Sequence, residues 1–194
     1  MAKDNKTNDI KLITLSNYTK PPVQKNTSKG FVLNGKNNSF YNYIIDRNNG
    51  SATNSSINQS YATLAYGKGL DYKNGKLGLE DWVLLRKALK PSQVRRMVAD
   101  YQVFGEFAFF VTKTKGGELH SVTHIPMQMV APAIANDDNE IESYWYCRDW
   151  SKQSEFKPEQ FDAYGMSKAG VTIYVAKPYR AGAEYFSTPD YVAG

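Results

Sequence analysis

Residues 94–150 constrain the fold more than any other stretch, because a helical pattern changes there into a strongly apolar strand pattern. The helical part has apolar residues at the spacing of one buried helix face, namely Val94, Met97, Val98 and Tyr101. In residues 107–112, apolar side chains occupy both alternating sets of positions, as in a strand that is covered on both faces. The stretch therefore predicts a helix that leads into a sheet with a well-buried first strand.

Turn residues divide the sequence after this first strand into further strands. Residues 115–117 (Lys-Gly-Gly) and 136–139 (Asn-Asp-Asp-Asn) are typical of turns, and Pro126 has no N–H to donate to a sheet ladder. Residues 150–161 are polar, and we expect a loop or a short helix there. We predict a mainly antiparallel β-meander of about four strands, at residues 107–112, 119–125, 141–148 and 171–177.

Three further helices are expected before this region. The first is short and begins at Asn38 or Ser39, whose side chain can accept a hydrogen bond from the first turn. The second begins at Thr53 or Asn54 and ends at Gly67. The first has an apolar face of Phe40, Tyr43 and Ile44, and the second has one apolar stripe of Ile57, Tyr61, Leu64 and Ala65. The third covers residues 79–89 and has a broad apolar face of Leu79, Trp82, Val83, Leu85, Ala88 and Leu89.

These elements predict an α+β fold: an extended N-terminal arm, three to four helices, and then the β-meander. We expect residues 1–30 to form a flexible basic arm and residues 31–194 to form one α+β domain. The net charge of +5 resides entirely in residues 1–37, which carry seven lysines and two acids. The arm is either a solvated tail or a contact for nucleic acid or an acidic partner, and its apolar patch at residues 10–15 could add as a strand to a neighbour.

A second basic feature lies around the junction of the third and fourth helices. Five cations occur there within eleven residues: Arg86, Lys87, Lys90, Arg95 and Arg96. They form either an ordinary solvated helix face or a stripe that contacts a polyanion or the acidic groups of a partner.

The sequence contains no arrangement that points to catalysis, a metal or a cofactor. His120 and His124 lie on a predicted strand, where four residues span roughly 13 Å, too far for one metal ion; we expect them at the surface or at an interface. Cys147 is expected to be a small buried apolar residue. Residues 67–70 (Gly-Lys-Gly-Leu) lack the spacing of a phosphate-binding P-loop. No segment approaches the roughly 20 apolar residues of a membrane span.

Three groups of short motifs follow one another between residues 31 and 191. The first is Asn38-Ser39-Phe40, Asp46 to Gly50 and Gly67-Lys68-Gly69-Leu70. The second is Val103 to Ala108, Val111, Lys115-Gly116-Gly117, His124-Ile125-Pro126 and Val130-Ala131-Pro132. The third is Glu140 to Trp150, Lys177-Pro178-Tyr179 and Pro189-Asp190-Tyr191. In this order the motifs resemble the N-terminal, wing portion of the portal proteins of tailed bacteriophages.

The resemblance implies a structural subunit rather than an enzyme. Portal proteins form a ring, typically a dodecamer, at one vertex of the capsid of the virion, which assembles in the cytoplasm of the host bacterium. The ring serves head assembly, DNA packaging and DNA ejection. Its partners are further copies of itself, the major capsid protein, the terminase, the head–tail adaptor, and double-stranded DNA that passes without sequence-specific contacts. The family has a stem, clip and crown that this sequence does not contain, so we expect the N-terminal part of a longer portal chain.

Two other functions remain open. A small DNA-binding accessory protein would use the lysine-rich arm and the Arg86–Arg96 cluster, and its binding to DNA would depend steeply on salt. A small enzyme with an unrecognised motif would have a deep pocket with converging polar groups near the sheet.

Overall fold

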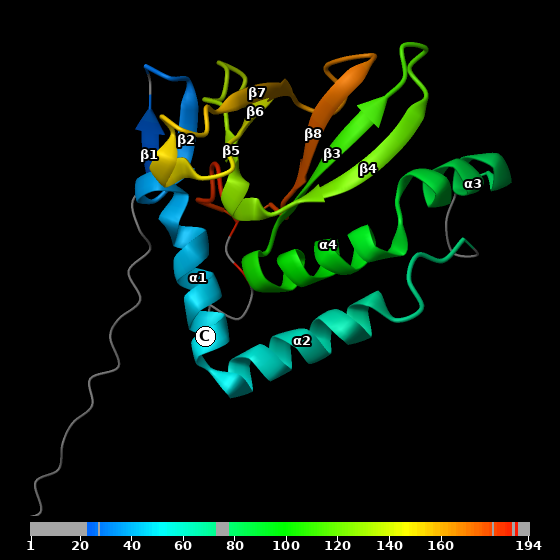
Figure 1. The fold of residues 1–194 in the computed structure, drawn as a ribbon, viewed down its shortest axis with the longest axis horizontal. Coiled ribbons are helices and arrows are strands. Elements are labelled where there is room, and N and C mark those ends of the chain that lie inside the picture. Colours follow the sequence, from blue (N-terminus) through cyan, green and yellow to red (C-terminus); the bar gives the residue numbers. More distant parts are fainter. Residues whose placement is uncertain (1–22, 27, 73–77, 180, 188, 190–194) are drawn as a thin grey trace, which may run out of the picture.

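The structure is a computed structural model that describes residues 23–26, 28–72, 78–179, 181–187 and 189. It confirms the α+β fold, with four helices and with strands that pair in antiparallel fashion (Figure 1). The helices are α1 (Ser39–Gly50), α2 (Ala52–Tyr66), α3 (Leu79–Ala88) and α4 (Pro91–Phe104). The strands are β1 (Val23–Asn26), β2 (Phe31–Asn34), β3 (Phe107–Lys113), β4 (Leu119–Ile125), β5 (Val130–Pro132), β6 (Ser143–Tyr146), β7 (Glu159–Asp162) and β8 (Gly170–Ala176).

The strands form two three-stranded sheets and a hairpin instead of the single predicted meander. One sheet has the order β4-β3-β8 and the other has the order β5-β6-β7, while β1 pairs with β2. In the predicted meander, the strand at 141–148 pairs with the strand at 119–125. This prediction is wrong, because the two strands lie in different sheets. β8 pairs along the whole of β3, because β3 is apolar on both faces and is buried best at the centre of a sheet.

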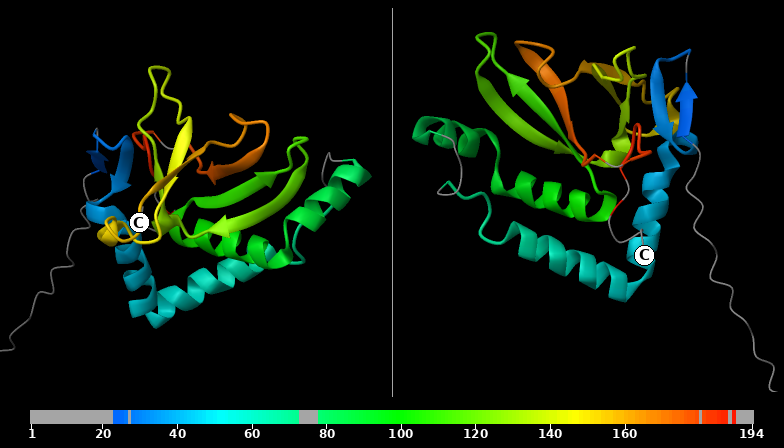
Figure 2. Two further views of the ribbon diagram at one scale, coloured as in Figure 1. Left: turned by 45° about the horizontal axis from the view of Figure 1, so that its top comes forward. Right: turned by 180° about the vertical axis from the view of Figure 1, so that it is seen from behind.

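Isolated bridges join these pieces into one strongly curved layer of strands. Phe31 of β2 bridges Ala133 after β5, and Ala163 after β7 bridges Ile173 of β8. Figures 1 and 2 show the resulting curve, with α4 lying against the β4-β3-β8 sheet and α2 lying outside α4. On one side of that sheet, α4 thus forms a second layer and α2 forms a third.

Both faces of β3 are covered, as its sequence predicts. Phe109 and Val111 pack with Ala88 and Val122 on the side of the helices. Ala108 packs on the opposite side, in the main core with residues of α1, β2, β5 and the C-terminal segment. The hairpin turn at residues 115–117 also forms as predicted, and Gly117 adopts a φ of +87°.

Asn38 has a different role from the predicted helix cap. It precedes α1 in the left-handed conformation, with φ +60°, and makes no capping hydrogen bond. Its buried side chain instead accepts a hydrogen bond from the N–H of Asn34 (2.9 Å) and donates to the carbonyls of Gln128 (3.1 Å) and Val130 (3.0 Å). Asn38 therefore connects β2 to β5 across the start of α1.

Replacing Asn38 by alanine is expected to lower the free energy of unfolding by about 2–4 kcal/mol, because three buried groups lose their partner and alanine disfavours positive φ. Asn38→Gly is the matched control, since it loses the same hydrogen bonds without the conformational cost. Urea denaturation should rank wild type above Asn38→Gly and Asn38→Gly above Asn38→Ala. Equal stability of the two variants would contradict the conformational part of this account.

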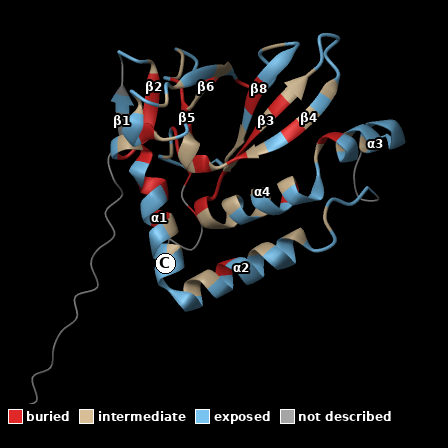
Figure 3. Ribbon diagram, in the orientation of Figure 1, coloured by how far each residue is buried: buried red, intermediate tan, exposed pale blue. Residues whose placement is uncertain are grey.

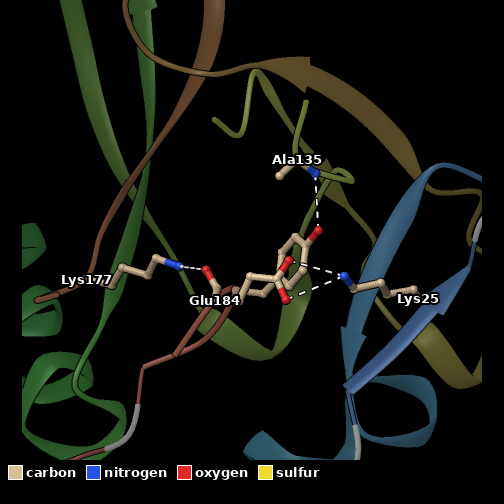
Figure 4. A network of polar contacts seen from close by, with 5 residues as sticks. Lys25, Ala135, Lys177 and Glu184 are labelled. Atoms are coloured by element: carbon tan, nitrogen blue, oxygen red, sulfur yellow. Dashed lines mark hydrogen bonds and ion pairs between the residues drawn. The ribbon is translucent and has the colours of Figure 1, made fainter. Parts of the chain in front are cut away.

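The C-terminal segment completes the main core. Tyr185 and Phe186 are buried there, and the Tyr185 hydroxyl accepts a hydrogen bond from the N–H of Ala135 (3.3 Å). Figure 4 shows the polar contacts around it: Lys25 donates to the Glu184 carboxylate (3.2 Å), and Lys177 donates to the Glu184 carbonyl (2.7 Å). The segment thereby joins β1, the end of β8 and the chain after β5.

β1 lies within the predicted arm, residues 1–30, and pairs with β2 along its whole length. The apolar patch at residues 10–15, for which strand addition to a neighbour was considered, lies outside the described residues.

Candidate interaction surface

The outer face of α2 is apolar and faces solvent. The sequence of α2 contains no charged residue, and Asn58 is its only buried residue. Ile57, Tyr61 and Leu64 lie one turn apart on the helix and are 48%, 58% and 76% exposed. Figure 3 shows most of α2 in the colour of exposed residues. An uncharged helix with an exposed apolar stripe is typical of a surface that another molecule covers.

The sequence places Ile57, Tyr61 and Leu64 on one apolar stripe, and the structure shows that this stripe is exposed. α2 is instead turned so that Asn58 faces α4. The Asn58 side chain donates to Asn48 of α1 (2.9 Å) and accepts from Gln102 of α4 (3.2 Å).

A cleft of about 650 Å³ lies between α2 and α4. Its lining includes neutral amides and hydroxyls, such as Asn48, Gln59 and Thr63, together with Arg95. The Arg95 guanidinium lies 4.8 Å from the centroid of the Tyr66 ring, as in a cation–π contact. No carboxylate, histidine or cysteine lines the cleft, so among the described residues it holds no acid–base pair.

α3 presents a second exposed apolar face. Leu79, Val83 and Leu84 are 63%, 58% and 52% exposed, and Ala88 is the only buried residue of the helix. The broad apolar face predicted for residues 79–89 is therefore largely solvent-facing. On α1, Tyr43 of the predicted apolar face is exposed, whereas Tyr41 is buried.

The five predicted basic residues lie together around the α3–α4 junction. Arg86 and Lys87 occupy the last turn of α3, and Lys90 precedes α4 directly. Arg95 and Arg96 lie on α4, and all five side chains belong to exposed residues. Among the described residues, none of the five takes part in an ion pair.

The two histidines do not lie in the same environment. His120 is exposed, whereas the His124 side chain is only 5% exposed and its Nε2 lies 2.8 Å from Oδ2 of Asp100 on α4. The expectation of a surface or interface residue is therefore wrong for His124. The pair attaches β4 to α4, together with a hydrogen bond from the His124 N–H to Gln93 (2.8 Å). The described residues include no group of three or more potential metal ligands.

Cys147 is buried, as predicted, and its Sγ lies 3.2 Å from the carbonyl oxygen of Phe156. Burial raises the pKa of the thiol, so it stays protonated and unreactive near neutral pH.

One buried carboxylate was not identified from the sequence as a residue with a role. Glu106 is 1% exposed, and it accepts hydrogen bonds from the hydroxyl of Tyr41 and from the N–H of Ser187 (3.1 Å). It lies between α4 and β3 and thereby connects α1 to the C-terminal segment. Its position between Gly105 and Phe107, in a strongly apolar stretch, is the only signal that the sequence offers.

The buried Tyr41 and the half-buried Tyr144 predict a loss of stability at alkaline pH. Burial, with the negative charge of Glu106, raises the pKa of Tyr144 to about 12 and that of Tyr41 well above 10. Unfolded tyrosines lose their protons near pH 10, so the unfolded state is favoured increasingly as the pH rises from 10 toward 12. Urea denaturation at pH 8, 10 and 11 should show a constant free energy of unfolding below pH 10 and a decline above it. Tyr144→Phe should reduce the decline, and an unchanged slope would contradict the assignment.

Within the part of the chain that the structure describes, no helix has the length and apolar character needed to span a bilayer. A scan against protein-family models gives no match, and a search of curated proteins finds no similar sequence.

Proposed function

We propose that this chain is a structural subunit of a ring of identical copies, and that the ring is a portal of the tailed-bacteriophage type. The role is structural rather than catalytic. In the particle, the ring would occupy a capsid vertex and serve head assembly, DNA packaging and DNA ejection. Its partners would be neighbouring copies, the major capsid protein, the terminase and the head–tail adaptor, and double-stranded DNA would pass without sequence-specific contacts.

The observation that carries this proposal is the uncharged, apolar outer face of α2. A helix that exposes Ile57, Tyr61 and Leu64 without one charged neighbour on the same helix is stabilised when a protein surface covers it. α3 has a second exposed apolar face. Together with the motif order that resembles portal wings, these faces favour a subunit whose neighbours complete its packing.

The alternative is a DNA-binding accessory protein that uses the lysine-rich arm and the α3–α4 cations. The five exposed cations give it a specific basis, because exposed cations without acidic partners bind phosphate groups. Within this cluster, the Arg95 guanidinium already lies 4.8 Å from the centroid of the Tyr66 ring, in a cation–π contact.

The test is the mass in solution by light scattering after size exclusion, with negative-stain images of the peak fraction. Rings of identical copies are expected. A monomer at all concentrations that also binds a duplex oligonucleotide, with affinity falling steeply between 50 and 200 mM salt, would contradict the ring and support the DNA-binding alternative.

A further inference from the structure

Two surfaces of opposite charge form no ion pair with another described residue. The first, here called the basic joint, consists of Arg86, Lys87, Lys90, Arg95 and Arg96, and no acidic residue occurs between residues 82 and 99. The second, here called the acidic turn, lies between β5 and β6 and consists of Asp137, Asp138, Glu140 and Glu142. No lysine or arginine occurs between residues 134 and 147.

The acidic turn holds its carboxylates outward on a rigid backbone. The Asn136 side-chain carbonyl accepts hydrogen bonds from the N–H groups of Asp138 (3.0 Å) and Glu140 (2.9 Å). Asp137, Asp138 and Glu140 are exposed, and none of them takes part in an ion pair with another described residue. A turn fixed in this way loses little conformational freedom when a partner binds it.

The two surfaces lie at different ends of the molecule. In Figure 2, the chain between β5 and β6 extends from the sheet side away from the helices, while the α3–α4 junction lies at the far end of the helical layers. All views agree on this separation, so one chain does not bring its own acidic turn to its own basic joint.

We propose that the acidic turn of one copy docks on the basic joint of the next copy, next to the exposed face of α3. Apolar contacts accompany the charges, since Ile134 before the turn is 37% exposed and Val83 and Leu84 are exposed on α3. Two different surfaces meet in such a head-to-tail contact, which repeats from copy to copy and is the type of contact that a closed ring requires. This inference rests on the proposed function and names the surfaces that make its contact.

Charge reversal tests the pairing directly. In the turn variant, Asp137, Asp138 and Glu140 are each replaced by lysine; in the joint variant, Arg86, Lys87 and Lys90 are each replaced by glutamate. Each variant alone places like charges at the contact, whereas a mixture of the two restores opposite charges at every contact. Sedimentation velocity at 50 mM salt is expected to show assembly of wild type, at least about tenfold weaker assembly of each variant, and recovery in the mixture.

Two control variants have the same change of net charge at exposed positions elsewhere. Asp46, Glu155 and Glu159 become lysine in one, and Lys115, Lys157 and Lys168 become glutamate in the other; all six residues are exposed. Both controls should assemble like wild type, and circular dichroism should show that all four variants are folded.

The outcomes separate this inference from the proposed function. If each charge-reversed variant assembles into rings as strongly as wild type, the pairing is overturned and the proposed ring is retained. Weak assembly of the joint variant alone, with loss of binding to a duplex oligonucleotide, would overturn the pairing and assign the basic joint to a polyanion. A wild-type chain that never assembles would contradict the proposed function itself, and the pairing with it.

Discussion

Replacing Ile57 and Leu64 by aspartate is expected to convert the assembled protein into a folded monomer. Both residues lie on the outer face of α2 and are about half and three-quarters exposed in the single chain, so the fold loses little packing. In an assembly that covers this face, two apolar side chains worth roughly 1.5–3 kcal/mol each would be replaced by buried charges. The dissociation constant should therefore rise by about 100-fold or more.

Light scattering after size exclusion measures this change, and thermal unfolding of the same samples checks the fold. The matched control is Ser154→Asp with Ala169→Asp, which adds two acids at exposed positions outside the helices. The control should assemble like wild type. If Ile57→Asp with Leu64→Asp assembles equally well, the outer face of α2 is not a contact between copies.

The second large effect is expected at Glu106. Glu106→Ala should lower the free energy of unfolding by about 2–5 kcal/mol, because the Tyr41 hydroxyl and the Ser187 N–H lose a buried acceptor, each at about 1–3 kcal/mol. Glu106→Gln keeps the size and one acceptor oxygen and should cost less. Urea denaturation at pH 7 gives both values.

Glu118→Ala is the control for this effect, since Glu118 is an exposed residue of the β3–β4 turn. A double-mutant cycle with Tyr41→Phe isolates the Tyr41–Glu106 interaction, because the two side chains are in direct contact and their effects should not add. If Glu106→Ala and Glu118→Ala lower the free energy of unfolding equally, within about 0.5 kcal/mol, the Glu106 carboxylate does not stabilise the core.

The sequence predicts those parts of the fold whose cause is local. Gly67 ends α2 and Gly117 lies in the β3–β4 turn, because the positive φ at these two positions favours glycine. The apolar character of residues 107–112 correctly indicates a strand covered on both faces. β7 was missed, because it is a four-residue strand with a polar sequence, and only its pairing with β6 makes it a strand.

The exposure of the candidate surface could not be predicted from the spacing of apolar residues along the sequence. An apolar stripe on α2 has the same spacing whether the domain itself or another molecule covers it, so the sequence predicts the stripe but not its neighbour. Asn38 has a residue type typical of helix caps, and only the tertiary fold brings Gln128 and Val130 to its amide. The five cations lie close together along the chain and are exposed, and their contact with a polyanion or a partner stays a prediction.

The pairing of β3 with β8 has a consequence for synthesis of the chain on the ribosome. β3 ends at Lys113 and β8 begins at Gly170, so more than 50 residues are translated before the second edge of β3 is paired. During this interval the growing chain presents a phenylalanine-rich strand with an open edge, which is the kind of segment that pairs wrongly with other chains. We expect chains that stop before residue 170 to aggregate, and we expect correct folding to depend on the last 25 of the 194 residues.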